Sequence, residues 1–145
     1  MERRDFVSNL SMAVALACAG GLAACTKHMA DAPDNNNGGG NNAKLTADLS
    51  TELLNTGNFK IGGGVILIRI AAGNTPAAFS ALSSICTHEG CTISTFNTGS
   101  ELIECNAPCG HGSRYTTTGA VQTGPATAAL AKMTVTINGN TLSVS

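Results

Sequence analysis

The sequence predicts an all-β domain, built as an antiparallel sandwich or barrel. From residue 44 onward, short segments of alternating or β-branched residues follow one another closely, and glycine, proline and asparagine separate them. No segment has a convincing helical period, and no internal repeat is present. Closely spaced short strands of this kind are typical of antiparallel sandwiches and barrels.

The first half of the predicted domain contains three expected strands. They are residues 44–49, 65–70 and 77–85. The segment 65–70 reads Val-Ile-Leu-Ile-Arg-Ile, and this β-branched, nearly apolar run predicts a central strand. Glycines 62–64 predict a turn before it, and residues 71–76 predict a turn after it. The strand 77–85 is expected to deliver Cys86 at its end.

The second half is predicted to contain two hairpins. Residues 92–96 and 101–104 flank the turn sequence Asn-Thr-Gly-Ser, and the second of these strands delivers Cys105. Residues 130–137 and 141–144 flank Asn138-Gly139-Asn140, which is a strong hairpin signal.

Four cysteines and two histidines lie within the 26 residues from Cys86 to His111, in two short groups. The first group is Cys86, His88 and Cys91, and the second is Cys105, Cys109 and His111. Two thiolates and two imidazoles form a complete ligand set for a [2Fe–2S] cluster with mixed ligation, and two cysteines then remain to tie the loops together. The hairpin between the groups returns the chain to the same end of the sheet, so the groups can face one another.

Composition excludes one class of partner. The chain has a net charge of −1, no basic patch and no ladder of aromatic residues, so nucleic acid is not an expected partner. Aromatic residues make up only 3% of the chain, which predicts a thin hydrophobic core. We therefore expect a cluster and a disulfide to contribute much of the stability.

The N-terminus has the features of an export signal. Residues 1–24 are predicted to be a signal peptide, because Arg3-Arg4 resembles a twin-arginine motif and the apolar run 10–22 is too short to span a bilayer comfortably. The sequence Leu-Ala-Ala-Cys that ends at Cys25 looks like a lipobox, so we expect lipid on Cys25. The alternative is an ordinary signal peptide in which Cys25 is incidental. Either reading predicts an exported protein, on the periplasmic or cell-surface side. Lipidation would in addition anchor it to a membrane.

The rest of the chain divides into a tether and one domain. Residues 25–43 are polar and rich in asparagine and glycine, and they predict a flexible tether. Residues 44–145 form the predicted domain, in which residues 85–116 are the cluster-binding part.

These motifs resemble those of the Rieske iron–sulfur family. Cys86-Thr87-His88-x-Gly90-Cys91 is similar to the first cluster-binding box of that family, and His111-Gly-Ser-Arg-Tyr115 is similar to the end of the second. Gly124-Pro125-Ala126 resembles the proline loop of the family. The resemblance runs from about residue 77 to residue 144.

The resemblance implies a fold and a set of roles. The fold is three stacked antiparallel sheets with a small cluster-binding subdomain. Cys86 and Cys105 would bind one iron, and His88 and His111 would bind the outer iron. Cys91 and Cys109 would form a disulfide. The hydroxyl of Ser113 would bond to a bridging sulfide and that of Tyr115 to the sulfur of Cys86, and both bonds would raise the reduction potential.

Two departures from the family pattern bear on these roles. The second box is three residues longer than usual, so Cys109 is an alternative ligand, with a Cys91–Cys105 disulfide. We favour Cys105, because sixteen residues separate it from His88, and Gly110 can absorb part of the insertion with a positive φ. Glu89 is the second departure. Its carboxylate is expected to lower the potential somewhat and to disfavour docking in an apolar quinol pocket.

The sequence therefore predicts a membrane-anchored electron carrier without a catalytic residue of its own. It would be a subunit or partner of a respiratory or other oxidoreductase, with quinol–cytochrome c reductase as one possible type. The expected partner is a redox protein, such as a cytochrome or an oxidoreductase subunit, or a quinol. Two alternatives remain open: a structural zinc domain with the same four ligands, and a disulfide-stapled β-domain acting as a surface lipoprotein.

Overall fold

The structure is a computed structural model, and it describes residues 42–145. The predicted signal peptide, Cys25 and all but the last two residues of the predicted tether lie outside these described residues. In residues 42–145, no helix is both long enough and apolar enough to cross a membrane.

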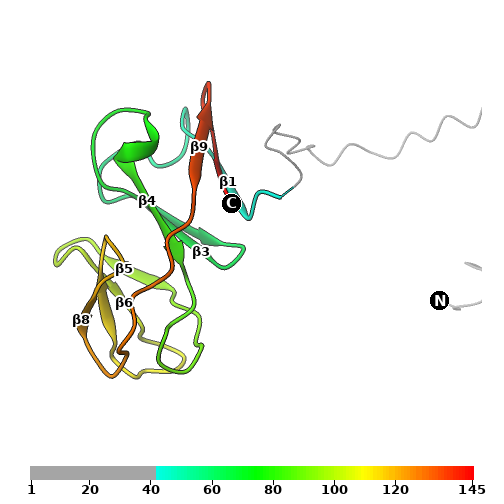
Figure 1. Ribbon diagram of the computed structural model, residues 1–145. Helices are drawn as coiled ribbons and strands as arrows, with labels where there is room; N and C mark the ends of the chain where they lie inside the picture. Colours follow the sequence, from blue (N-terminus) through cyan, green and yellow to red (C-terminus); the bar gives the residue numbers. More distant parts are fainter. Residues whose placement is uncertain (1–41) are drawn as a thin grey trace, which may run out of the picture. The chain divides into compact units, whose positions relative to one another are not determined.

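The described chain forms three antiparallel sheets, which confirms the predicted fold class (Figure 1). The first sheet has the strand order β1-β10-β9, the second β2-β3-β4, and the third β5-β6-β7-β8. The strands are β1 (Leu45–Asp48), β2 (Phe59–Gly62), β3 (Val65–Arg69), β4 (Phe79–Ser83), β5 (Thr95–Asn97), β6 (Leu102–Glu104), β7 (Arg114–Thr116), β8 (Val121–Thr123), β9 (Val135–Asn138) and β10 (Thr141–Val144). One turn of 3₁₀ helix, η1 (Pro76–Ala78), precedes β4.

Strand β3 lies between two hydrophobic cores, as its sequence predicts. All five of its residues are buried. Val65 and Leu67 belong to the core that includes β1 and β10, whereas Ile66 and Ile68 belong to the core that includes Ile103 of β6. Because both faces of the strand are covered, apolar side chains are favoured at successive positions rather than at alternate ones.

Several elements differ from the sequence prediction. Strand β2 has no clear alternation of apolar and polar residues and was not expected. The segment expected as a strand at 77–85 contains the end of η1, because proline favours the first position of a helical turn. The segment 130–137 is regular only from Val135, since residues 131–133 bond instead to β4, including a bridge between Lys132 and Leu82.

The hairpin β5–β6 brings the two cysteine and histidine groups to one end of this domain. Thr95 pairs with Glu104, so the loop that leaves β6 starts beside the segment that enters β5. A bridge between Ile85 and Thr92 closes the first loop at its base. In Figure 1 the loops that follow β4 and β6 lie together at the lower end. The predicted return of the chain is therefore present in the structure.

Candidate metal centre

Tight turns shape the two loops that carry the predicted ligands. In the first, the backbone N–H of Cys86 donates to Cys91 O at 2.7 Å, and that of Gly90 donates to Cys86 O at 3.0 Å. In the second, Cys105 N–H donates to Ser113 O at 2.9 Å. Gly110 has a φ of +65°, as expected for the residue that absorbs the insertion.

A disulfide joins the two loops. It links Cys91 to Cys109, whose Cα atoms are 6.3 Å apart. Cys86 and Cys105 are free and almost completely buried. The structure therefore contains the disulfide that the resemblance implies, rather than the alternative between Cys91 and Cys105. The assignment of Cys86 and Cys105 as iron ligands stays a prediction.

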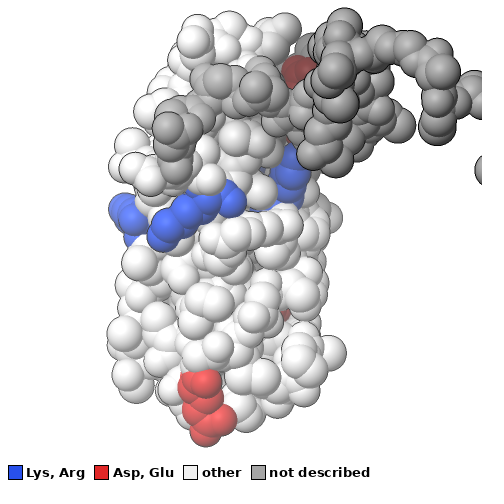
Figure 2. Space-filling model, turned by 90° about the vertical axis from the view of Figure 1, so that its right-hand side faces the viewer, with Lys and Arg blue, Asp and Glu red and all other residues white. Residues whose placement is uncertain are grey.

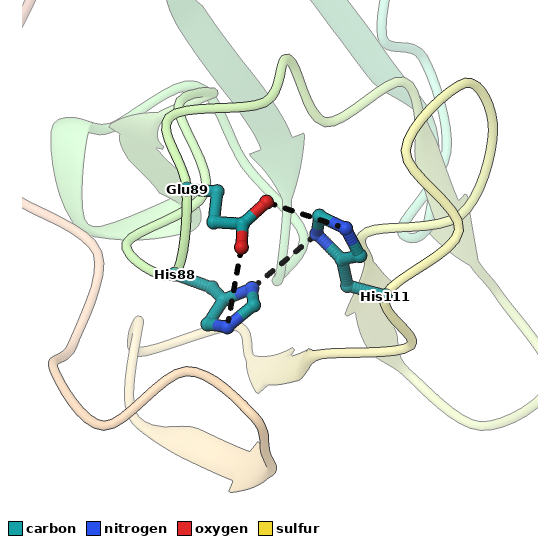
Figure 3. A group of neighbouring side chains, drawn as sticks. All are labelled: His88, Glu89 and His111. Atoms are coloured by element: carbon teal, nitrogen blue, oxygen red, sulfur yellow. Dashed lines mark hydrogen bonds and ion pairs between the residues drawn. The ribbon is translucent and has the colours of Figure 1, made fainter.

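The two imidazoles face each other at the surface (Figure 3). His88 Nδ1 and His111 Nδ1 are 3.3 Å apart, and the side chains are 28% and 30% exposed. Two nitrogens bound at about 2 Å to one tetrahedral metal are separated by roughly 3.3 Å. The pair thus has the spacing that a single metal requires, with the thiols of Cys86 and Cys105 buried at the base of the same loops.

The donor set fits a [2Fe–2S] cluster. Two nitrogens converge at the surface and two thiols converge in the interior. One iron could therefore bind the two nitrogens and the other iron the two sulfurs. The disulfide takes up the other two cysteines of the two groups.

Tyr115 supports the inner side of this site. Its hydroxyl lies 3.2 Å from Cys86 Sγ and accepts the backbone N–H of Thr87, also at 3.2 Å. The Thr87 hydroxyl donates its own proton to Ala128 O at 2.6 Å. Because that proton is used, Thr87 Oγ1, 3.1 Å from the Tyr115 hydroxyl, is a second acceptor for the proton of Tyr115 beside Cys86 Sγ. The bond from Tyr115 to the sulfur of Cys86 that the resemblance implies stays a prediction.

Ser113 is fully buried beside the same thiols. Its Oγ accepts the backbone N–H of Ala126 at 3.0 Å, so its hydroxyl proton remains available to a sulfur. Through Thr87 and Ser113, the loop 124–130 is bonded to both ligand loops. The predicted bond from Ser113 to a bridging sulfide remains a prediction.

The surroundings separate the pKa values of the two thiols. Burial raises the pKa of Cys86, but hydrogen bonds from Tyr115, the His88 backbone N–H, Cys105 and Ser113 outweigh burial and bring it below the ordinary value. Burial, together with the neighbouring Cys86, raises the pKa of the Cys105 thiol to about 11. Burial likewise raises the pKa of Tyr115, with a contribution from Cys86. The lower pKa favours the thiolate form of Cys86, which is the form that a metal ligand requires.

Glu89 lies over the outer edge of both imidazoles, a placement that the sequence did not indicate. Its Oε2 is 3.4 Å from His111 Nε2, and its Oε1 is 4.0 Å from His88 Nε2 (Figure 3). A histidine that binds metal through one nitrogen commonly donates its other N–H to a carboxylate. The adjacency of Glu89 and His88 is visible in the sequence, but the contact with His111 depends on the fold.

Glu104 is a second residue that the sequence analysis missed. Its nearly buried carboxylate accepts hydrogen bonds from Asn97 and Asn106 and pairs with Arg114 Nε at 3.4 Å. Asn106 is the first residue after Cys105 in the lengthened loop. Glu104 therefore ties that loop to β5 and β7.

Comparison with known proteins identifies the domain. A profile of the Rieske [2Fe-2S] domain matches residues 46–134. The chain is 38% identical over 71 residues to the cytochrome b6-f complex iron-sulfur subunit of Synechococcus sp. (strain JA-2-3B'a(2-13)). This match covers 49% of this chain and 39% of that protein. It is 35% identical over 107 residues to the same subunit of Prochlorococcus marinus (strain NATL1A), covering 73% of this chain and 58% of that protein.

The chain thus spans about two fifths to three fifths of the length of these curated relatives. Among solved structures, one described as a hyperthermophilic respiratory Complex III superimposes with a TM-score of 0.51 at 24% identity. The match covers 70% of this chain and 74% of that chain, and it bears on the fold alone.

Serine substitution separates the two cysteines of the lengthened loop. We expect Cys105→Ser to lose most of the bound iron, because it removes the predicted buried ligand of the inner metal. Cys109→Ser should retain iron but lower the free energy of unfolding by about 3 kcal/mol, the value for a disulfide that closes a loop of this length. Iron analysis and urea denaturation measure the two effects. Loss of iron in Cys109→Ser with retention in Cys105→Ser would reverse the assignment.

Proposed function

We propose that this chain, which belongs to the Rieske [2Fe-2S] family, is a one-electron carrier whose cluster is held by Cys86, Cys105, His88 and His111. The observation that carries the proposal is the 3.3 Å separation of the two Nδ1 atoms at the surface, together with two free, buried thiols in the same two loops. When bound, the cluster accepts and releases one electron, and ligation by histidine gives it a higher potential than ligation by cysteine alone.

The surrounding residues prepare the site for this task. The imidazoles are partly exposed, so they offer the shortest route to a partner. Cys86, Cys105, Tyr115 and Ser113 are all buried, so water is excluded from the part of the site that contains the thiols. The disulfide and the bonds to loop 124–130 hold both ligand loops in place while the charge changes. These features favour electron transfer with little rearrangement.

We further propose that the protein is exported and held on a membrane by lipid on Cys25. The twin arginines, the short apolar run and the lipobox support this localisation. The polar tether between Cys25 and the domain would let the cluster reach its partner.

A Cys25→Ser variant should move from the membrane fraction to the soluble fraction when cells are broken, while a Cys18→Ser variant should not.

For the partner, we propose another redox protein, either within a complex or as a separate oxidoreductase. The curated relatives are named as iron-sulfur subunits of the cytochrome b6-f complex, which supports membership of a redox complex. A quinol is the other candidate donor.

Spectroscopy of the purified protein tests the proposed cofactor and ligand set. The protein should be coloured, should contain equal amounts of iron and acid-labile sulfide, and should show, when reduced, the electron paramagnetic resonance signal of a centre with mixed histidine and cysteine ligands. A colourless protein that contains zinc, or one that contains no metal and four paired thiols, would contradict the proposal.

Tyr115→Phe tests the predicted tuning of the cluster. Removing the hydroxyl removes a hydrogen bond that stabilises negative charge on Cys86 sulfur, so the reduction potential should fall by roughly 60 mV. For a one-electron couple this corresponds to about 1.4 kcal/mol, close to the contribution of a hydrogen bond to a charged acceptor. Voltammetry measures the shift. Thr116→Val is the matched control, because within residues 42–145 the Thr116 hydroxyl bonds only to Thr118, so its loss should leave the potential unchanged.

A further inference from the structure

We propose that Glu89 makes the histidine end of this domain a docking site for a redox protein with a cationic surface, on which a lysine or arginine meets the carboxylate directly over the two imidazoles. This inference rests on the proposed function and specifies the partner of the same site. It is carried by the position of Glu89 and by the absence of other charges around it.

The tip, defined here as loops 84–94, 105–113 and 124–131, has one acidic or basic residue besides its histidines. That residue is Glu89. Figure 2 shows basic side chains in a band across the middle of one face and an acidic group at its lower end. Basic and acidic residues are thus separated on this face. A charge that stands alone on a neutral surface is not cancelled by its neighbours, so it dominates the local potential.

The carboxylate of Glu89 is also open to a partner. Its side chain is 60% exposed, and its only polar contacts in the described chain are with the two imidazoles. Three other carboxylates of the described chain have partners of their own. Glu52 pairs with Lys60, Glu104 pairs with Arg114, and Asp48 accepts bonds from Ser50.

The cluster itself does not mask this charge. With two thiolate and two imidazole ligands, the formal charges of two ferric ions and two sulfides are balanced in the oxidised state, and the reduced state is negative. Glu89 is thus the main charge at the tip when the cluster is oxidised, and reduction adds to it. In both states the tip attracts a cationic surface and repels an anionic one.

The same placement disfavours a quinol. A quinone oxygen that approached the imidazoles would need an N–H at Nε2, where Glu89 already lies within 3.4–4.0 Å. Insertion into an apolar pocket would also strip water from the carboxylate, which is costly without a cationic partner. Apart from Ile85, which is 41% exposed, the remaining exposed residues of the tip are neutral and mostly small, so a protein surface can approach the rings closely. They include Thr87, Gly90, Ala107, Pro108, Gly112 and Pro125.

Electron transfer to a basic protein tests the charge of Glu89. The reduced protein is mixed with a basic c-type cytochrome at several ionic strengths, and the second-order rate constant is measured. At low salt Glu89→Gln should be about fivefold slower, and its rate should depend less on ionic strength. Glu101→Gln is the matched control, because Glu101 is an exposed carboxylate in the β5–β6 turn and lies outside the tip. It should behave like the wild type.

Two further measurements separate docking from a change in reduction potential. The ratio of the rates with tris(phenanthroline)cobalt(III) and hexacyanoferrate(III) should fall at least fivefold in Glu89→Gln, since a change in potential affects both rates in the same direction. The dissociation constant for zinc-substituted cytochrome c, which binds without electron transfer in the dark, should rise about fivefold.

Equal salt dependence in the wild type and Glu89→Gln would overturn the inference. The inference would also be overturned if a short-chain ubiquinol reduced the wild type with saturable kinetics and the wild type showed no preference for the cationic cobalt complex over hexacyanoferrate(III). In either case a normal resonance signal would leave the electron-carrier function intact. A protein that lacks the signal altogether would instead contradict the proposed function.

Discussion

The disulfide between Cys91 and Cys109 limits the distance between the two loops that carry the histidines. In the described chain, strand pairing joins these loops only at their bases. Within each loop, a predicted ligand lies only a few residues from the disulfide, so the bond limits how far His88 and His111 can separate. The hairpin β5–β6 supplies the complementary constraint, because its pairing brings Cys105 back beside the first loop. Together they bring the loops that carry the four predicted donor atoms to one region of the domain.

The site also combines two environments that a redox centre needs. The thiols lie in the core that contains Ile66, Ile103 and Tyr115, where hydrogen bonds to sulfur are not weakened by water. The imidazoles lie at the surface and share a carboxylate with which solvent and a partner can also interact. Strand β3 makes this possible in a small domain, since its buried residues serve both cores at once.

Much of this arrangement was predictable from local sequence, and the limits have physical causes. The apolar run at Val65–Arg69 and the hairpin around Gly139 were predicted because strong local patterns specify them. Strand β2 was missed because its pairing with β3, rather than its own pattern, makes it a strand. The contacts of Glu89 with His111 and of Glu104 with Asn97 join residues from different loops, and spacing along a chain carries no such information.

The loop 124–130 meets the ligand loops through its main chain. The carbonyl of Ala128 accepts the Thr87 hydroxyl, and the N–H of Ala126 donates to Ser113, whereas the side chains at positions 127–129 are exposed. Substitutions at these exposed positions can therefore remodel the rim that the proposed partner would meet, without disturbing the main-chain bonds to Thr87 and Ser113. This division gives evolution, or a protein engineer, a means to exchange docking specificity while the redox chemistry stays constant.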